Sequence, residues 1–505
     1  MLKMEKLEIL SQIDFGQRIA EDESDQLQRY FMMTDPWKRV SSGEIDVIYG
    51  PKGSGKSAIY SVLENETDKL FEKGILIISA ENPRGNTVFS GLTTNPPTSE
   101  IEFINLWKLY FILITHTVLS DWSIKDENTD EIGRVLTESQ LISSNNASLR
   151  TILSASFNYI RQLSRIESIQ PGIELNELSG VPNGINFKIS FREPTFNEQK
   201  SGIVSAERLF ELLDNALKKA NISLWILIDR LDVAFSEDIE LETNALRALF
   251  KVYNDIKPHT KIILKVFLRN DIWKRITRDG FREASHITKT ITIDWNKESI
   301  LNLIILRILN NEILLEYLDI DRDAVLKDIH AQEEVFYRLF PDQVDQGAKK
   351  PKTLDWIISR VKDGQGVTAP REVIHLINEA KTEQIKKLQL GEDDLTDENI
   401  IGRSAIKSAL ESVSKVRLEQ TIYAEFPSLT PYIQQLENEK AEQTIETLSN
   451  IWQKSEPEAQ QIAKELHFIG FFEERGTKQE PRYWIPFMYR SELNITQGAA
   501  DQNLE

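Results

Sequence analysis

One segment of eight residues carries glycines, a lysine and a serine at the spacing of a phosphate-binding loop. It reads Gly50-Pro51-Lys52-Gly53-Ser54-Gly55-Lys56-Ser57 and is followed by Ala58. The glycines let the backbone turn so tightly that its N–H groups point at phosphate oxygens. Lys56 is expected to reach the β- and γ-phosphates, and the Ser57 hydroxyl is expected to ligate Mg²⁺. The predicted chemistry is the binding of ATP with Mg²⁺ by residues 50–58 and the transfer of the γ-phosphate to water.

Two aspartates, Asp229 and Asp232, follow a short apolar run that begins at Ser223. An apolar run that is too short for a helix and ends in an acid is typical of a buried parallel strand. We expect Asp229 to serve the metal ion together with Ser57, and Asp232 to orient or deprotonate the attacking water. The structural alternatives are a turn made by Asp229 and a helix cap made by Asp232.

A candidate sensor of the γ-phosphate is Arg269, which directly follows the predicted strand 261–268. Polar groups at the carboxyl end of a parallel strand emerge at the edge of the sheet where ligands bind. The structural alternative is an ion pair of Arg269 with Asp271 or Asp229 that holds the loop.

A second candidate sensor is Arg371, which lies in the first turn of a helix that begins near Pro370. A positive charge at this end opposes the helix dipole, which favours a functional reason for the arginine. The alternative is a surface ion pair with Glu372 or Glu379.

Five segments, four of them apolar runs and the last an alternating one, predict the strands that hold these residues at one edge of a sheet. They span 43–49, 74–79, 223–229, 261–268 and 288–294. Helical stretches lie between them, so the pattern predicts an α/β fold: the parallel, doubly wound sheet of a P-loop NTPase.

The rest of the chain predicts four regions. They are an N-terminal helical segment (1–40), the P-loop core (41–296) with a long insertion at about 80–205, a helical lid (297–400) and a winged-helix-like C-terminal domain (401–505). In the last region we expect a hairpin of strands 468–472 and 483–486 around a polar turn. Such a module holds DNA or another protein, but here its basic side chains are countered by glutamates. The insertion makes either partner contacts or decorative packing.

The composition bounds the class of protein. With 505 residues, 40% of them hydrophobic and 28% charged, the chain is expected to be globular and soluble. It has no cysteine, which excludes disulfides and thiolate metal sites, and its net charge of −19 argues against coating nucleic acid with its whole surface. The longest strongly apolar stretch, 106–114, contains Lys108 and falls short of the ~20 residues of a membrane span. We therefore expect a cytoplasmic protein without a membrane helix.

These motifs together resemble the bacterial STAND-like and AAA-related P-loop ATPases, which are often encountered in genome-defence (anti-phage) loci. The spacing of Asp229 and Asp232 resembles the STAND pattern more than the adjacent Asp-Glu of ordinary AAA+ enzymes. Arg230 departs from the small residue usual in STAND proteins, which suggests a phosphate or inter-subunit contact, and no repeat array follows the ATPase. The other segments that carry the resemblance are 15–21, 30–31, 34–37, 50–57, 226–228, 267–273 and 370–372.

The resemblance implies a slowly hydrolysing switch whose lid and C-terminal module change position with the nucleotide. Such a switch controls its own assembly as a homo-oligomer or acts on a partner effector protein, here in anti-phage defence. Two other functions stay open. A DNA repair or nucleic-acid remodelling ATPase would be stimulated by DNA, whereas a nucleotide-locked scaffold would retain nucleotide without turnover.

Overall fold

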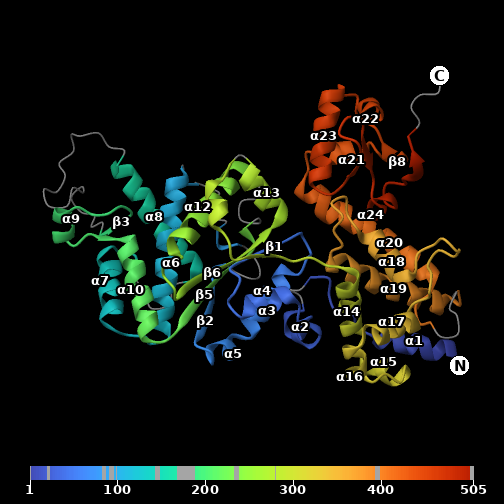
Figure 1. The fold of residues 1–505 in the computed structure, drawn as a ribbon, viewed down its shortest axis with the longest axis horizontal. Helices are drawn as coiled ribbons and strands as arrows, with labels where there is room; N and C mark the ends of the chain where they lie inside the picture. Colours follow the sequence, from blue (N-terminus) through green and yellow to red (C-terminus); the bar gives the residue numbers. More distant parts are fainter. Residues whose placement is uncertain are drawn as a thin grey trace. The chain divides into compact units, whose positions relative to one another are not determined.

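The computed structural model describes residues 2–19, 23–81, 87–89, 96–97, 99–142, 148–167, 188–231, 238–278, 280–392 and 399–500. These residues form two compact units (Figure 1). The first, here called the terminal unit, comprises Met1–Thr34, Pro51–Gly55 and Ile293–Glu505. The second, here called the sheet unit, comprises Asp35–Gly50 and Lys56–Thr292.

The sheet unit is built on five parallel strands in the order β2-β5-β6-β1-β7. This sheet confirms the predicted α/β class, and each of the five predicted segments supplies one strand. In the parallel register, Gly50 at the end of β1 pairs with Arg269 at the end of β6. The carboxyl ends of all five strands therefore share one edge. The bounds are β1 Val47–Gly50, β2 Ile75–Ser79, β5 Ser223–Ile228, β6 Ile262–Arg269 and β7 Thr290–Thr292.

Helices flank this sheet along the chain. Within the range of the predicted insertion, a two-residue strand β3 (Ile189–Ser190) pairs with β4 (Val204–Ser205). The helices of the sheet unit are α3 Asp35–Ser41, α4 Lys56–Asn65, α5 Thr67–Phe71, α6 Glu100–Asp121, α7 Glu127–Glu138, α8 Leu149–Glu167, α9 Phe196–Lys200, α10 Ala206–Lys219, α12 Ile239–Ile256, α13 Asn270–Arg278 and the 3₁₀ helix η3 Arg282–His286.

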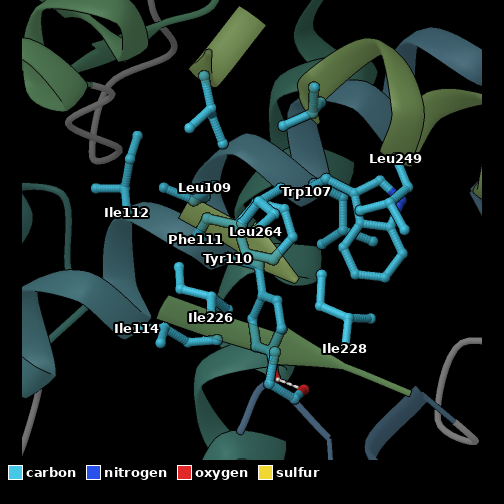
Figure 2. Close-up of a cluster of buried hydrophobic side chains, with 14 of the residues drawn as sticks. Trp107, Leu109, Tyr110, Phe111, Ile112, Ile114, Ile226, Ile228, Leu249 and Leu264 are labelled. Carbon is cyan, nitrogen blue, oxygen red and sulfur yellow. Dashed lines mark hydrogen bonds between the residues drawn. The ribbon is translucent and has the colours of Figure 1, made fainter. Parts of the chain in front are cut away.

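Helix α6 forms the centre of the core of the sheet unit. Figure 2 shows its aromatic and aliphatic side chains gathered with those of β5 and β6. Two of its buried aromatic residues also form hydrogen bonds: the indole N–H of Trp107 donates to Ala245 O at 2.9 Å, and the Tyr110 hydroxyl donates to Ala80 O at 2.8 Å. Among the described residues, α6 alone is long and apolar enough to cross a membrane by length and composition. Most of that helix is buried inside the protein, as in the core helix of a globular domain.

The terminal unit joins the N-terminal segment to the long helical region that follows residue 293. Its core is a separate cluster of buried side chains. Its helices are α1 Leu2–Gln12, α2 Ser24–Tyr30, α14 Lys297–Ile308, α15 Glu312–Tyr317, α16 Arg322–Lys327, α17 Ile329–Leu339, α18 Thr353–Val361, α19 Pro370–Leu390, α20 Arg403–Arg417, the π-helical η4 Leu418–Tyr423, α21 Thr430–Gln434, α22 Ile445–Trp452, α23 Glu456–Phe468 and α24 Phe487–Arg490.

A buried ion pair fastens the N-terminal segment to α14. Arg307 Nη2 donates to Glu23 Oε1 at 2.9 Å, and both side chains are at most 6% exposed. Arg307 Nη1 also donates to Phe15 O at 2.8 Å, and the Tyr30 hydroxyl donates to Glu23 Oε2 at 2.7 Å. Gly16 has φ +75°, and a Cβ there would lie 2.1 Å from Arg307 Nη1. The upstream residues Phe15, Gly16 and Tyr30 thus surround one buried charge pair.

A small four-stranded sheet completes the terminal unit, in the order β11-β8-β10-β9. The predicted hairpin is present, but its first strand was predicted wrongly at 468–472. Phe468 ends α23, and Phe471 and Phe472 are both fully buried, which two successive residues of a strand with one exposed face cannot be. The polar segment that we expected to form the turn supplies the strand instead. The bounds are β8 Lys440–Gln443, β9 Glu473–Gly476, β10 Pro481–Trp484 and β11 Thr496–Ala499.

Candidate phosphate-binding site

The loop between β1 and α4 has the backbone of a phosphate cradle. Gly53 and Gly55 have φ values of +78° and +97°, a left-handed region that residues with a side chain rarely adopt. A Cβ at Gly53 would lie 3.0 Å from Arg371 Cβ and 3.4 Å from Ala369 Cβ. Turns of this kind aim successive N–H groups into one concavity that suits an anion. Helix α4 begins at Lys56, so its positive N-terminal end lies at the same place.

The ammonium group of Lys56 is folded back over its own loop. Its Nζ donates a hydrogen bond of 2.9 Å to Gly50 O, the last carbonyl of β1. Both ends of that bond belong to the sheet unit. Lys56 is therefore held above the loop, where a phosphate on the cradle would find a cation.

The hydroxyl and carboxylate expected to serve Mg²⁺ lie side by side. Ser57 Oγ donates to Asp229 Oδ2 at 3.2 Å, and Asp229 is only 8% exposed. The other carboxylate oxygen accepts the N–H of Arg230 at 2.9 Å, which fixes its orientation. Magnesium prefers oxygen ligands and commonly takes one or two from the protein and the rest from phosphates and water. Ser57 and Asp229 therefore supply oxygen ligands of the kind that a phosphate-bound Mg²⁺ ion takes from a protein.

The backbone after Asp229 is turned unusually. Arg230 has φ +58°, a conformation that costs an L-residue with a side chain roughly 1–2 kcal/mol. The turn sends the chain away from β5 immediately after the carboxylate. Asp232, the candidate acid for the attacking water, lies outside the described residues.

Arg269 lies at the carboxyl edge but is held by a neighbour. Its Nε and Nη2 donate to the two carboxylate oxygens of Asp271 at 3.1 and 2.9 Å. Burial raises the pKa of a carboxyl group, but the guanidinium of Arg269 outweighs burial here, and the pKa of Asp271 lies below its ordinary value. The ion pair of Arg269 with Asp271, which we named as the structural alternative to a sensor of the γ-phosphate, is present.

Arg371 lies in the terminal unit together with the tip of the loop. Helix α19 begins at Pro370, with Pro at its first turn as expected, and the N–H of Arg371 is 3.5 Å from Gly53 O. Glu372 pairs with the buried Arg417 at 3.1 Å, and Glu379 lies 3.8 Å from His375. Glu372 thus has another cationic partner, whereas the neighbour of Glu379 is a histidine whose pKa is lowered by burial.

Two residues beside the loop, Trp295 and Glu425, were not found from the sequence as site residues. The indole N–H of Trp295 donates to Ser54 O at 2.8 Å. The ammonium of Lys52 forms an ion pair with Glu425. Both partners belong to the terminal unit. No local signal marks Trp295 or Glu425, because each lies more than 200 residues from the loop.

The structure brings the predicted site residues together in two sets. In the sheet unit, Lys56, Ser57, Asp229 and Arg269 lie at the carboxyl edge of the sheet. In the terminal unit, residues 51–55 lie beside Arg371. The first set carries the charges for a phosphate and a metal ion, and the second carries the cradle backbone.

Comparisons with known proteins add little to this geometry. No family model matches the chain, and no curated protein matches it. One solved structure that it resembles is that of the Aeropyrum pernix ORC2 protein in ADPNP–ADP complexes, at 12% sequence identity. The match covers 95% of this chain and 96% of that one, with a TM-score of 0.27. A likeness at this level supports no conclusion on function.

Proposed function

We propose that this protein binds ATP with Mg²⁺ at residues 50–58 and hydrolyses it slowly. The observation that supports this most is the Ser57–Asp229 pair, 3.2 Å apart at the foot of a loop whose glycines have positive φ. A hydroxyl and a buried carboxylate at that spacing are suited to a hard cation that also binds phosphate oxygens.

The roles of the chain's own residues follow from their positions. The loop N–H groups bind and orient the phosphates, and Lys56 leaves Gly50 O to neutralise developing negative charge. Asp229 and Ser57 hold the metal ion, which draws charge from the β- and γ-phosphates when bound. Asp232 remains our candidate for orienting water, and Arg371 our candidate for sensing the γ-phosphate.

We further propose that hydrolysis serves a switch rather than a motor. In this proposal the helical range 297–400 and the C-terminal module change position with the nucleotide and control self-assembly or a partner effector. A role in anti-phage defence is supported only by the sequence resemblance to STAND-like ATPases.

The test compares Lys56→Ala with Lys69→Ala, whose side chain is 70% exposed on α5. Binding of a fluorescent ATP analogue and release of phosphate are measured for both. Lys56→Ala should weaken binding at least about tenfold and abolish hydrolysis, because it removes the charge at the cradle and not a core contact. Lys69→Ala should behave as wild type. Unchanged binding and turnover in Lys56→Ala would refute the proposal.

Two further outcomes would replace the switch with another function. Strong stimulation of hydrolysis by DNA, lost at high salt, would indicate a nucleic-acid motor. Tight retention of nucleotide with no turnover would indicate a scaffold.

Asp229→Asn should lose the dependence of binding on Mg²⁺, and retained dependence would exclude Asp229 as the metal carboxylate.

A further inference from the structure

The tip of the phosphate-binding loop is attached to the terminal unit at three points. Trp295 donates to Ser54 O at 2.8 Å, and the Arg371 N–H is 3.5 Å from Gly53 O. The third attachment is the ion pair of Lys52 with Glu425. The first two use backbone carbonyls, so they are insensitive to the charge of a ligand. The third joins a cation of the loop to a carboxylate, so it is sensitive to that charge.

Glu425 comes from a distinctive part of the chain. It lies two residues after the end of η4, the π-helical segment Leu418–Tyr423, which continues from α20. Such widened turns occur frequently at functional sites. The side chains of Lys52 and Glu425 are 28% and 23% exposed, so water screens their attraction only in part. The pair links the module that follows α20 to a loop built for anions.

We propose that Glu425 senses nucleotide by competing with the bound triphosphate for Lys52. The inference rests on the proposed function, because it needs a polyphosphate on the loop. A polyphosphate places several negative charges beside Lys52 and so offers its ammonium group another partner. The same charges repel the carboxylate of Glu425. Nucleotide binding therefore weakens the pair and releases the segment that follows η4.

Thermodynamic linkage gives this competition a measurable sign. If nucleotide weakens the pair, the pair must weaken nucleotide binding by the same factor. Removing the carboxylate is then expected to tighten binding. A purely structural role predicts the opposite, because a loop that loses an attachment is less ordered and binds less well.

The experiment measures the affinity for a non-hydrolysable Mg²⁺–ATP analogue by calorimetry. Glu425→Gln keeps the size of the side chain and should tighten binding by about three- to tenfold. The expected gain is modest because water partly screens the attraction between Lys52 and Glu425. The matched control is Glu419→Gln, which removes the same charge from η4, where the side chain is 50% exposed and 4.0 Å from Lys415. The control should leave the affinity unchanged.

A double-mutant cycle separates the pair from other effects. In the Lys52→Gln background, Glu425→Gln should no longer change the affinity, because the group for which it competes is gone. In the wild type, analogue binding should also speed hydrogen exchange in residues 424–436, a readout that a structural role would not move. Unchanged or weaker binding by Glu425→Gln, or an equal gain in the Lys52→Gln background, would overturn the inference. Failure of the wild type to bind the analogue would instead refute the proposed function and, with it, this inference.

Discussion

The buried pair Arg307–Glu23 makes a strong prediction about stability. Replacing Arg307 with Met removes the only cation within hydrogen-bond distance of Glu23 among the described residues and leaves Phe15 O without that donor. The Tyr30 hydroxyl and the Gln17 N–H would remain as donors to the carboxylate. Breaking a buried ion pair by removing one partner typically costs about 3–5 kcal/mol, because the other charge stays buried. Both side chains here are at most 6% exposed, so the full range applies.

Hydrogen exchange is the suitable assay, since a chain with two compact units need not unfold in one step. A loss of about 3–5 kcal/mol corresponds to a roughly 150- to 5,000-fold rise in the opening equilibrium, at 1.36 kcal/mol for each factor of ten. This rise is expected in the amides of α1, α2 and α14. Arg307→Lys should fall between Met and wild type, because one ammonium cannot reproduce the planar fork of the guanidinium. Protection within tenfold of wild type in Arg307→Met would refute the reasoning.

Three further predictions concern single side chains. Gly53→Ala should lower nucleotide affinity, because the new Cβ would lie 3.0 Å from Arg371 Cβ. Gly366→Ala is the control, since Gly366 also has a positive φ (+79°) but a Cβ there would meet no atom within 4 Å, and its affinity should be unchanged in a calorimetric titration. Trp295→Phe keeps an aromatic ring but removes the indole N–H that donates to the loop, so calorimetry should show a loss of stability of about 1 kcal/mol. Burial lowers the pKa of Lys265 from 10.5 to about 8. Between these two pH values the unfolded state binds more protons than the folded state, so the free energy of unfolding should rise with pH. Urea melts of wild type should show this rise relative to Lys265→Met.

Local patterns in the sequence predicted the sheet and the cradle well. Each strand is marked by a short apolar or alternating run, and residues 50–58 are contiguous, so these features can be predicted without knowledge of distant partners. The helix that begins at Pro370 could be predicted for the same reason, because its start is marked by one residue.

Features that depend on distant pairing could not be predicted in this way. Arg307 lies in a helix with a mainly apolar sequence, and none of its sequence neighbours indicates that its partner is Glu23. Trp295 and Glu425 lie beside the loop only because the terminal unit folds around residues 51–55. The first strand of the C-terminal hairpin was misplaced because the apolar run that contains Phe471 and Phe472 is typical of a strand, whereas both side chains are buried in the core of the terminal unit. Contacts between residues far apart in the sequence, which local patterns do not reveal, decide each of these cases.

The Arg307–Glu23 pair can form only after most of the chain between the two residues has been synthesised. The two residues are 284 positions apart, and at about 5–20 residues per second the ribosome needs roughly 14–57 s to make the chain between them. Throughout that interval the N-terminal segment lacks the cation that neutralises Glu23, so it cannot reach its final burial. The N-terminal segment is therefore made well before its ion pair with α14 can form. Until then, Ile9 and Leu10 of α1, which are buried in the folded protein, remain more exposed to water.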